Sequence, residues 1–398
     1  MYHFFLCCIV ETGGKYRLSS SRERIVTALD HKEPDRVPIA FGGLHDSIHL
    51  IGHRKLKKHF GLDGGEDIIQ DPFQQIVFPD DRLLGILHSD IQPVYAKPPG
   101  SYTFEYKDEG DIRTYTDEWG TKYKQPKRGG LYFDFAGHIL SGKSIDEIKT
   151  HPFPDPEKPS RFAGLREKVR NFNDKTDKAI IAYSPTGGVY EHTYWLRGIE
   201  ESFIDMASNI KALEVLTERI LEWMLRFWAS YLKEIGDLVQ IVQVGDDLGG
   251  QDGPLFSPKI YREIYKPKQK KLISLIKKNT DAKIYFHSCG SIYEYIPDLI
   301  EIGVDVLNPV QVHAARMESD RLKKEFGKDL SFWGGGADPV KIMSNGSARD
   351  VEEEVKRRID DFGPGGGFVF ASIHNIQADV PPGNVAQFFE TAYRYGVY

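Results

Sequence analysis

Short apolar runs alternate with amphipathic stretches along the C-terminal part of this chain of 398 residues. Such runs are typical of parallel strands that are buried on both faces, and the stretches between them have helical spacing. Because parallel strands need a crossover connection, the alternation predicts an α/β fold built on a parallel sheet. The predicted strands are Ala179–Tyr183, Leu238–Val244, Lys283–Phe286, Val304–Leu307, Leu330–Trp333 and Gly367–Ala371.

Two earlier segments, Val37–Phe41 and a weaker one near Asp90–Tyr95, would complete the eight strands of a single (β/α)8 TIM barrel. Alternating patterns such as Tyr102–Tyr106 predict antiparallel hairpins. We therefore expect a hairpin-rich insertion at about residues 95–135, as an N-terminal elaboration of the barrel. Helices are predicted at Ser21–His31, from Phe203 to Trp228, and at Pro258–Lys278, Ile292–Ile302, Met317–Phe326 and Ala348–Phe362.

The composition limits the compartment and the partners. Residues 1–18 precede a serine cap and are expected to be a disordered or non-native extension, so the barrel domain is predicted to span residues 19–398. The apolar segment Tyr2–Val10 is too short to cross a bilayer and has no basic stretch before it. The net charge of −6 argues against nucleic acid as a partner. Three cysteines, two of them adjacent, form no disulfide framework, so we predict a cytoplasmic protein that binds neither membrane nor nucleic acid.

Candidate metal ligands stand at the ends of two predicted strands, where barrel enzymes carry their functional groups. His287 and Cys289 are two residues apart, so their side chains leave the same face of an extended segment. His374 follows the last predicted strand. Three ligands of these types with one open position are the catalytic arrangement of zinc. The spacing alone also fits a small buried cysteine and histidines that only form hydrogen bonds.

Carboxylates at other strand ends are candidates for catalysis. Asp246 and Asp247 follow a predicted strand and could orient a ligand histidine, bind a cofactor or act as an acid or base. A helix cap or turn is the alternative, and we expect Asp246 to be functional and Asp247 structural. Tyr190 and Glu191 follow another strand and could face the same pocket, although Glu191 fits a helix start equally well.

Gly334, Gly335 and Gly336 follow the seventh predicted strand. Without side chains they would let the backbone approach a bulky ligand closely. Gln251, a few residues after the adjacent aspartates, is a further candidate for binding a cofactor.

The chain resembles the uroporphyrinogen decarboxylase-like superfamily over most of its length from Ser21 to the end. This resemblance implies a TIM barrel. The matching segments are Arg22–Arg24 with Lys32–Pro38, Ser257–Pro258 with Tyr261 and Glu263, Phe286–Gly290, Asp305–Pro309, Gly334–Gly336 and His374–Val385.

Two branches of that superfamily differ in chemistry. The decarboxylase branch carries an arginine-rich motif that binds the carboxylates of its tetrapyrrole, but the equivalent residues 38–46 contain no arginine. The corrinoid methyltransferase branch carries His-x-Cys and a later cysteine that completes a zinc site. His287 and Cys289 match the first two ligands, and His374 stands at the third position. A histidine there makes the site less rich in thiolate and more electrophilic.

The resemblance therefore implies a zinc-dependent methyltransferase that moves a methyl group between a small thiol or methylated compound and a corrinoid (cobalamin). The corrinoid would arrive on a partner protein, because the chain has no Asp-x-His-x-x-Gly binding module. Gly334–Gly336 and Gln251 would lie against it. Two alternatives stay open: a uroporphyrinogen decarboxylase-type enzyme without metal, and a non-catalytic barrel that binds a corrinoid or porphyrin.

Overall fold

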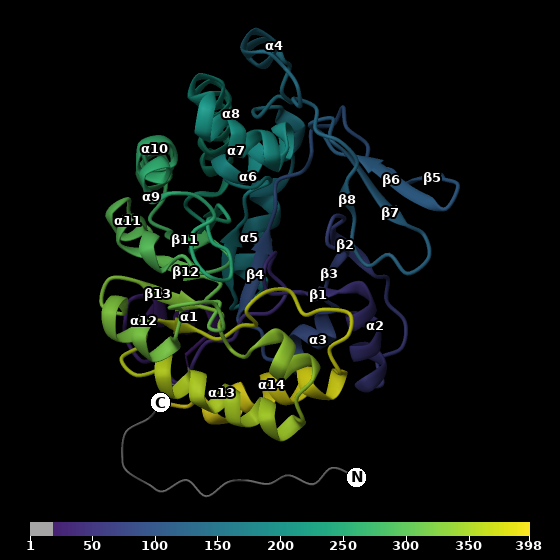
Figure 1. The fold of residues 1–398 in the computed structure, drawn as a ribbon. Helices are drawn as coiled ribbons and strands as arrows, with labels where there is room; N and C mark the ends of the chain where they lie inside the picture. Colours follow the sequence, from purple (N-terminus) through teal and green to yellow (C-terminus); the bar gives the residue numbers. More distant parts are fainter. Residues whose placement is uncertain (1–18) are drawn as a thin grey trace, which may run out of the picture.

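The computed structural model describes residues 19–398, which form a barrel of parallel strands surrounded by helices (Figure 1). Within these residues the parallel sheet has seven strands in the order β14-β13-β12-β11-β10-β9-β4. They lie where the sequence predicted strands, although several are shorter. Their bounds are Ile91–Val94 (β4), Ala179–Ala182 (β9), Ile241–Gly245 (β10), Lys283–His287 (β11), Val306–Asn308 (β12), Ser331–Trp333 (β13) and Phe368–Val369 (β14).

The segment around Ile39 closes the barrel between β14 and β4. On one side Ala40 N donates to Phe370 O and Phe370 N donates to Pro38 O, both at 2.8 Å. On the other side Asp90 N, just before β4, donates to Ile39 O at 2.8 Å. The segment thus takes the place of the first predicted strand, and the fold is the single (β/α)8 TIM barrel that the sequence predicted.

Helices between the strands cover the outside of the barrel with their apolar faces inward. The helix α8 (Ile210–Ile235) illustrates this, because its buried residues recur every three or four positions. Among residues 19–398, no helix is both long and apolar enough to cross a membrane. The other helices on this layer are Ser21–Leu29 (α1), Leu165–Lys175 (α5), Val189–Arg197 (α6), Ile199–Ser208 (α7), Lys266–Asn279 (α10), Ile296–Glu301 (α11), Ser319–Phe326 (α12), Ala348–Phe362 (α13) and Pro382–Tyr395 (α14).

Two of the predicted helices are interrupted. Asn209 separates α7 from α8, where one continuous helix was expected. Between α9 (Pro258–Ile260) and α10 the residues Tyr261–Tyr265 form a π-helical turn. The remaining helices, at the periphery, are Leu50–His59 (α2), Asp81–Ile86 (α3) and Ile145–Thr150 (α4), with short turns at Pro159–Arg161, Tyr293–Tyr295 and Pro339–Ser344.

Antiparallel strands project beside the barrel in the region of the predicted hairpins (Figure 1). A small cluster of Tyr115, Tyr123 and Phe133 forms their core. A second antiparallel sheet that the sequence did not predict lies closer to the barrel. The strands are Lys107–Glu109 (β5), Ile112–Thr116 (β6), Lys122–Pro126 (β7) and Asp134–Phe135 (β8) in the first sheet, and Ile48–His49 (β1), Ile68–Asp71 (β2) and Ile76–Phe78 (β3) in the second.

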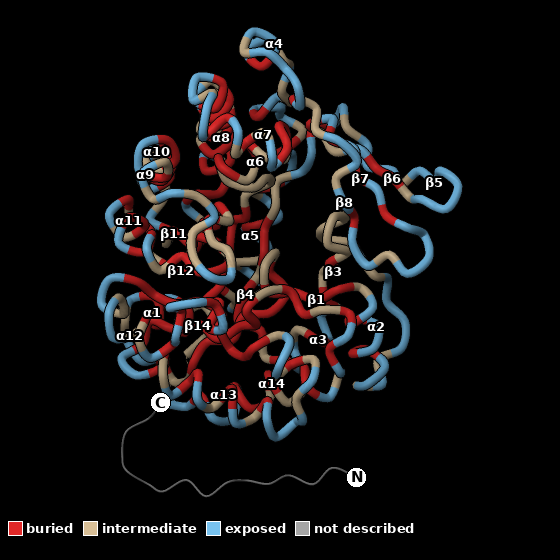
Figure 2. The backbone as a smooth tube through the Cα atoms, in the orientation of Figure 1, coloured by how far each residue is buried: buried red, intermediate tan, exposed pale blue. Residues whose placement is uncertain are grey.

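Burial is concentrated in the strands and the inner helix faces (Figure 2). The interior of the barrel is filled by side chains that include Ile181, Tyr183, Tyr285 and Trp333. Function is therefore expected at the mouth of the barrel and not in a central pore. The extension expected at residues 1–18 lies outside the described residues.

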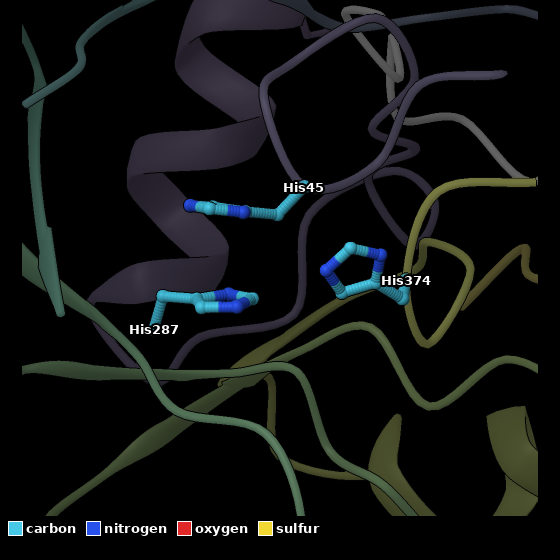
Figure 3. Close-up of side chains that lie close together, drawn as sticks. All are labelled: His45, His287 and His374. Carbon is cyan, nitrogen blue, oxygen red and sulfur yellow. The ribbon is translucent and has the colours of Figure 1, made fainter. Parts of the chain in front are cut away.

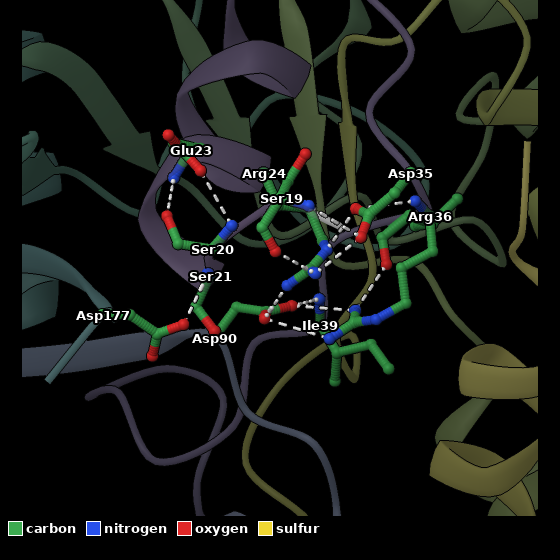
Figure 4. A network of polar contacts seen from close by, with 11 residues as sticks. Ser19, Ser20, Ser21, Glu23, Arg24, Asp35, Arg36, Ile39, Asp90 and Asp177 are labelled. Carbon is green, nitrogen blue, oxygen red and sulfur yellow. Dashed lines mark hydrogen bonds and ion pairs between the residues drawn. The ribbon is translucent and has the colours of Figure 1, made fainter. Parts of the chain in front are cut away.

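A buried network of charges joins α1, the closing segment and β4 (Figure 4). Asp90 is 1% exposed and accepts hydrogen bonds from Arg24 at 2.6 Å, from Arg36 at 2.9 and 3.0 Å, and from Ile39 N at 2.8 Å. Arg24 also binds Asp35 at 2.7 Å. Burial alone would raise the pKa of Asp35, but the hydrogen bonds from Arg24 outweigh it and hold that pKa below its ordinary value.

Replacing Asp90 with Ala should lower the free energy of unfolding by about 3–5 kcal/mol, because two largely buried guanidinium groups would lose a shared partner. Asp281→Ala, at an exposed aspartate, is the control and should change it by less than about 0.5 kcal/mol. Urea denaturation measures both. A loss below about 1 kcal/mol for Asp90→Ala would show that the network does not hold the barrel closed.

Candidate metal centre

Three histidines from different strand ends face one another at the mouth of the barrel (Figure 3). His287 ends β11, His374 follows β14, and His45 lies in the loop after the closing segment. The rings of His45 and His287 are stacked with centroids 3.6 Å apart, and those of His287 and His374 are 5.6 Å apart. One ring nitrogen from each residue lies within 4.8 Å of the others. Imidazoles at this spacing can share a metal ion once one of the two stacked rings turns so that the lone pairs converge.

Asn308 fixes the orientation of His287. The Nδ1 atom of His287 lies 2.6 Å from Asn308 Oδ1, and Asn308 Nδ2 donates to Trp333 O at 3.1 Å. Because the amide nitrogen of Asn308 is used by that carbonyl, its oxygen faces His287 and accepts the Nδ1 proton. The Nε2 atom of His287 therefore keeps its lone pair for a ligand, as in zinc sites where a second contact orients the histidine.

A second cluster contains the same histidine. The Nε2 atom of His287 lies 3.5 Å from Cys289 Sγ and 3.6 Å from Asp247 Oδ1. Asp247 also accepts the N–H of Cys289 at 2.8 Å. Burial, together with the nearby carboxyl groups of Asp247 and Glu191, raises the pKa of Cys289 well above its ordinary value, so a thiolate there requires a cation beside it.

The ligands proposed from the sequence are thus divided between two clusters. His374 lies with His45 and His287, whereas Cys289 lies with Asp247 and His287. Residue spacing did not indicate His45, because its loop has no regular pattern. Its position directly after the first strand, equivalent to the positions of the other candidates, was the available signal.

The histidine cluster fits a metal ion. Neither ring nitrogen of His45 has a hydrogen-bond partner among residues 19–398, although both are buried. Burial, followed by the proximity of His287 and His374, lowers the pKa of His45 well below its ordinary value. Burial likewise lowers the pKa of His374 to about 4. Neutral imidazoles with unused lone pairs that face one another are the donors that zinc prefers.

Asp246 was expected to be functional and Asp247 structural, but the contacts of Asp246 are those of a structural residue. Asp246 Oδ1 accepts the N–H groups of Tyr190 at 2.8 Å and Glu191 at 3.0 Å, and Asp246 Oδ2 accepts Gln269 Nε2 at 2.8 Å. Asp246 therefore caps the N-terminus of α6 and connects it to α10. Asp247, not Asp246, is the aspartate beside the candidate ligands.

The other predicted catalytic residues lie at the start of α6. Burial raises the pKa of Glu191 well above its ordinary value, and the charges of Asp247 and Asp246 raise it further, which favours the protonated form. The ring of Tyr190 packs on Phe256, with centroids 4.7 Å apart. Glu191 is consequently the better placed of the two for proton transfer.

The predicted cofactor-binding glycines are closely packed. A Cβ atom on Gly336 would lie 2.6 Å from Phe388, and one on Gly334 would lie 3.0 Å from Ser372 O. Gly334 and Gly335 also have positive φ angles, which favour glycine. Packing and backbone conformation therefore explain these glycines, and the space beside Gly334 and Gly336 is occupied by the chain itself.

Gln251 is connected through Gln311 to the backbone beside Cys289, a candidate ligand. Its Oε1 accepts Gln311 Nε2 at 2.9 Å, and Gln311 Oε1 accepts Gly290 N at 2.8 Å, next to Cys289. Gln251 is exposed, so a role in binding a cofactor at the mouth stays a prediction.

Comparison with known proteins identifies the family of this chain. The family model described as uroporphyrinogen decarboxylase (URO-D) matches residues 110–395. A uroporphyrinogen decarboxylase of Pseudoalteromonas atlantica is 23% identical over 298 residues, covering 72% of this chain and 77% of that protein. Another, from Pseudomonas aeruginosa, is 24% identical over 300 residues, covering 71% and 76%. The chain therefore belongs to the uroporphyrinogen decarboxylase family and is an enzyme of that superfamily.

A solved structure shares the fold. A methyltransferase from Methanosarcina mazei superposes with a TM-score of 0.64 at 14% sequence identity, covering 95% of this chain and 99% of the other. At this identity the likeness establishes the barrel architecture alone.

The buried cap at Asp246 should make stability depend on pH. Burial raises the pKa of Asp246 to about 7, whereas an aspartate in an unfolded chain titrates near 3.9. Between these values the folded protein keeps a proton that the unfolded chain releases, so this contribution to the free energy of unfolding falls as the pH rises from about 4 to about 7. Asp246→Asn removes it. Between about pH 5 and about pH 7.5 the free energy of unfolding, measured by urea denaturation, should fall more for the wild type than for Asp246→Asn. Equal falls in the two proteins would contradict the assignment.

Proposed function

We propose that the protein is a zinc-dependent methyltransferase that moves a methyl group between a small substrate, a thiol or a methylated compound, and a corrinoid carried by a partner protein. The observation that supports it best is His287, whose Nδ1 is held by Asn308 while its Nε2 faces Cys289 at the barrel mouth. In this proposal His287, Cys289 and His374 hold the zinc ion. When bound, such an ion supplies Lewis acidity, which favours the deprotonated form of a thiol or polarises the bond to a methyl group.

The residues around the site have separate tasks in this proposal. Asn308 keeps the lone pair of His287 directed into the mouth. Asp247 holds the backbone N–H of Cys289 and so positions its thiol. The carboxyl group of Glu191, whose raised pKa favours the protonated form, can give a proton to the heteroatom that loses its methyl group, and its carboxylate can receive one from a thiol in the reverse direction.

A decarboxylase is the second candidate, because the curated relatives described above carry that name. An eight-carboxylate tetrapyrrole requires cationic partners, and residues 38–46 supply none. The loop there instead carries His45 and Asp46. Asp46 accepts hydrogen bonds from Gly43 N and Trp333 Nε1, and burial raises its pKa to about 6. Asp46 therefore holds this loop and adds no cation for a polyanionic substrate.

Purified protein is expected to contain about one zinc ion per chain. Cys289→Ser should lower zinc affinity by at least about tenfold, because a serine hydroxyl is not deprotonated at neutral pH. It should also abolish methyl transfer, measured by the visible spectrum of the corrinoid, while the thermal unfolding midpoint of the metal-free protein stays unchanged. Asp252→Asn, at an exposed residue, is the control. Full methyl transfer by Cys289→Ser would show that the reaction does not need this ligand, whereas a wild-type protein with neither zinc nor methyl transfer would favour the decarboxylase or the carrier.

His374→Cys should keep zinc bound, since a thiolate replaces an imidazole in the same position, whereas His374→Ala should lose it. Competition with a chelator measures both affinities. If the two variants lose zinc equally, His374 is not a ligand and the ion is held elsewhere at the mouth.

A further inference from the structure

We infer that His45 is a further ligand of this metal ion, which would then be bound by the imidazoles of His45, His287 and His374 together with Cys289. The inference rests on the zinc of the proposed function but not on the reaction. Zinc accommodates a fifth ligand, so four protein ligands still leave access for a substrate.

The distances allow one ion to reach all the rings. His45 is stacked on His287, and its centroid is 6.1 Å from that of His374. Ligand nitrogens around a tetrahedral zinc ion lie roughly 3.3–3.5 Å apart, given bonds of about 2.0–2.1 Å. The nitrogens here already lie within 4.8 Å of one another, so shifts of roughly an ångström, together with a turn of one of the two stacked rings that lets both lone pairs converge, would complete the site.

The unused nitrogens of His45 distinguish it from other histidines nearby in the chain. His49 uses both nitrogens, with Nε2 3.0 Å from Leu131 O and Nδ1 accepting Ile51 N at 3.1 Å. His53 also uses both, with Nδ1 2.9 Å from Asp67 and Nε2 accepting Asp80 N at 3.1 Å.

Buried polar atoms are rarely left without a partner, because desolvation costs about 1–3 kcal/mol that a hydrogen bond would offset. Within residues 19–398, both ring nitrogens of His45 are buried and have no hydrogen-bond partner. A metal ion accepts one lone pair and would account for the unpaired ligand nitrogen.

The loop that carries His45 is fastened to the loop that carries His374. The side chain of Asn375 accepts Ser47 N at 2.8 Å and donates to Leu44 O at 3.0 Å, so it holds the residues on both sides of His45. Asn375 directly follows His374 in the chain. The two loops are thereby held together beside the two imidazoles, as second contacts do around metal ligands.

Asp46 holds the same loop through contacts within the loop and with the barrel. Its carboxylate accepts Gly43 N at 2.6 Å and Trp333 Nε1 at 3.0 Å, and its backbone oxygen accepts Gly42 N at 3.0 Å. These contacts bind the loop to β13, the strand whose Trp333 also supports Asn308. Trp333 therefore contacts both Asp46, which holds the loop of His45, and Asn308, which orients His287.

Zinc titration of the full chain, with a competing chelator, tests the inference. His45→Gln should lower zinc affinity by at least about tenfold, as His374→Gln does. His59→Gln, at an exposed histidine on α2, should leave it unchanged. His45→Gln with wild-type affinity would overturn the inference.

A cobalt(II) spectrum gives an independent readout if His45→Gln folds poorly. His45→Cys should retain the metal and strengthen the thiolate-to-cobalt charge-transfer band, because a second thiolate would join the ion. An unchanged band would show that position 45 lies outside the coordination sphere. If the wild-type protein binds no zinc, the inference and the proposed zinc site fail together. If it binds zinc and only the His45 variants behave as wild type, the proposed function stands without this ligand.

Discussion

The closure of the barrel depends on Asp90, which supplies hydrogen bonds that a regular strand would otherwise make to the closing segment. The closing segment is too short to form a regular ladder, yet Asp90 pairs with Ile39 twice, through its backbone N–H and through its carboxylate. Such a carboxylate can be buried only because Arg24 and Arg36 neutralise it. The loop that carries His45 continues directly from this segment. The geometry of the mouth therefore depends on a charge network at the other end of the barrel, where the strands begin.

The mouth itself combines neutral donors with buried acids. Burial lowers the pKa values of His45 and His374 and raises that of Glu191, so the uncharged forms of these groups are favoured before a cation binds. A divalent ion beside Cys289 and Asp247 would change this balance by stabilising the thiolate and the carboxylate together. The same low-dielectric environment that disfavours isolated charges therefore favours a bound metal with its anionic ligands.

The sequence predicted the barrel because strands buried on both faces leave continuous apolar runs, which loops cannot imitate. It also predicted that His287 and Cys289 share a face, because that follows from the period of an extended chain. It did not indicate His45, whose position is set by contacts with Asn375 from the far end of the chain. Nor could it decide which of the adjacent residues Asp246 and Asp247 caps α6, since that depends on a turn of the backbone after β10.

The shared position of His287 has a thermodynamic consequence. This residue belongs both to the histidine cluster and to the cluster with Cys289 and Asp247. Free-energy changes do not add when two residues act through one partner. Removing His287 would therefore already include much of the effect of removing a residue from either cluster, and the two groups of ligands would behave as one cooperative unit in a double-mutant cycle.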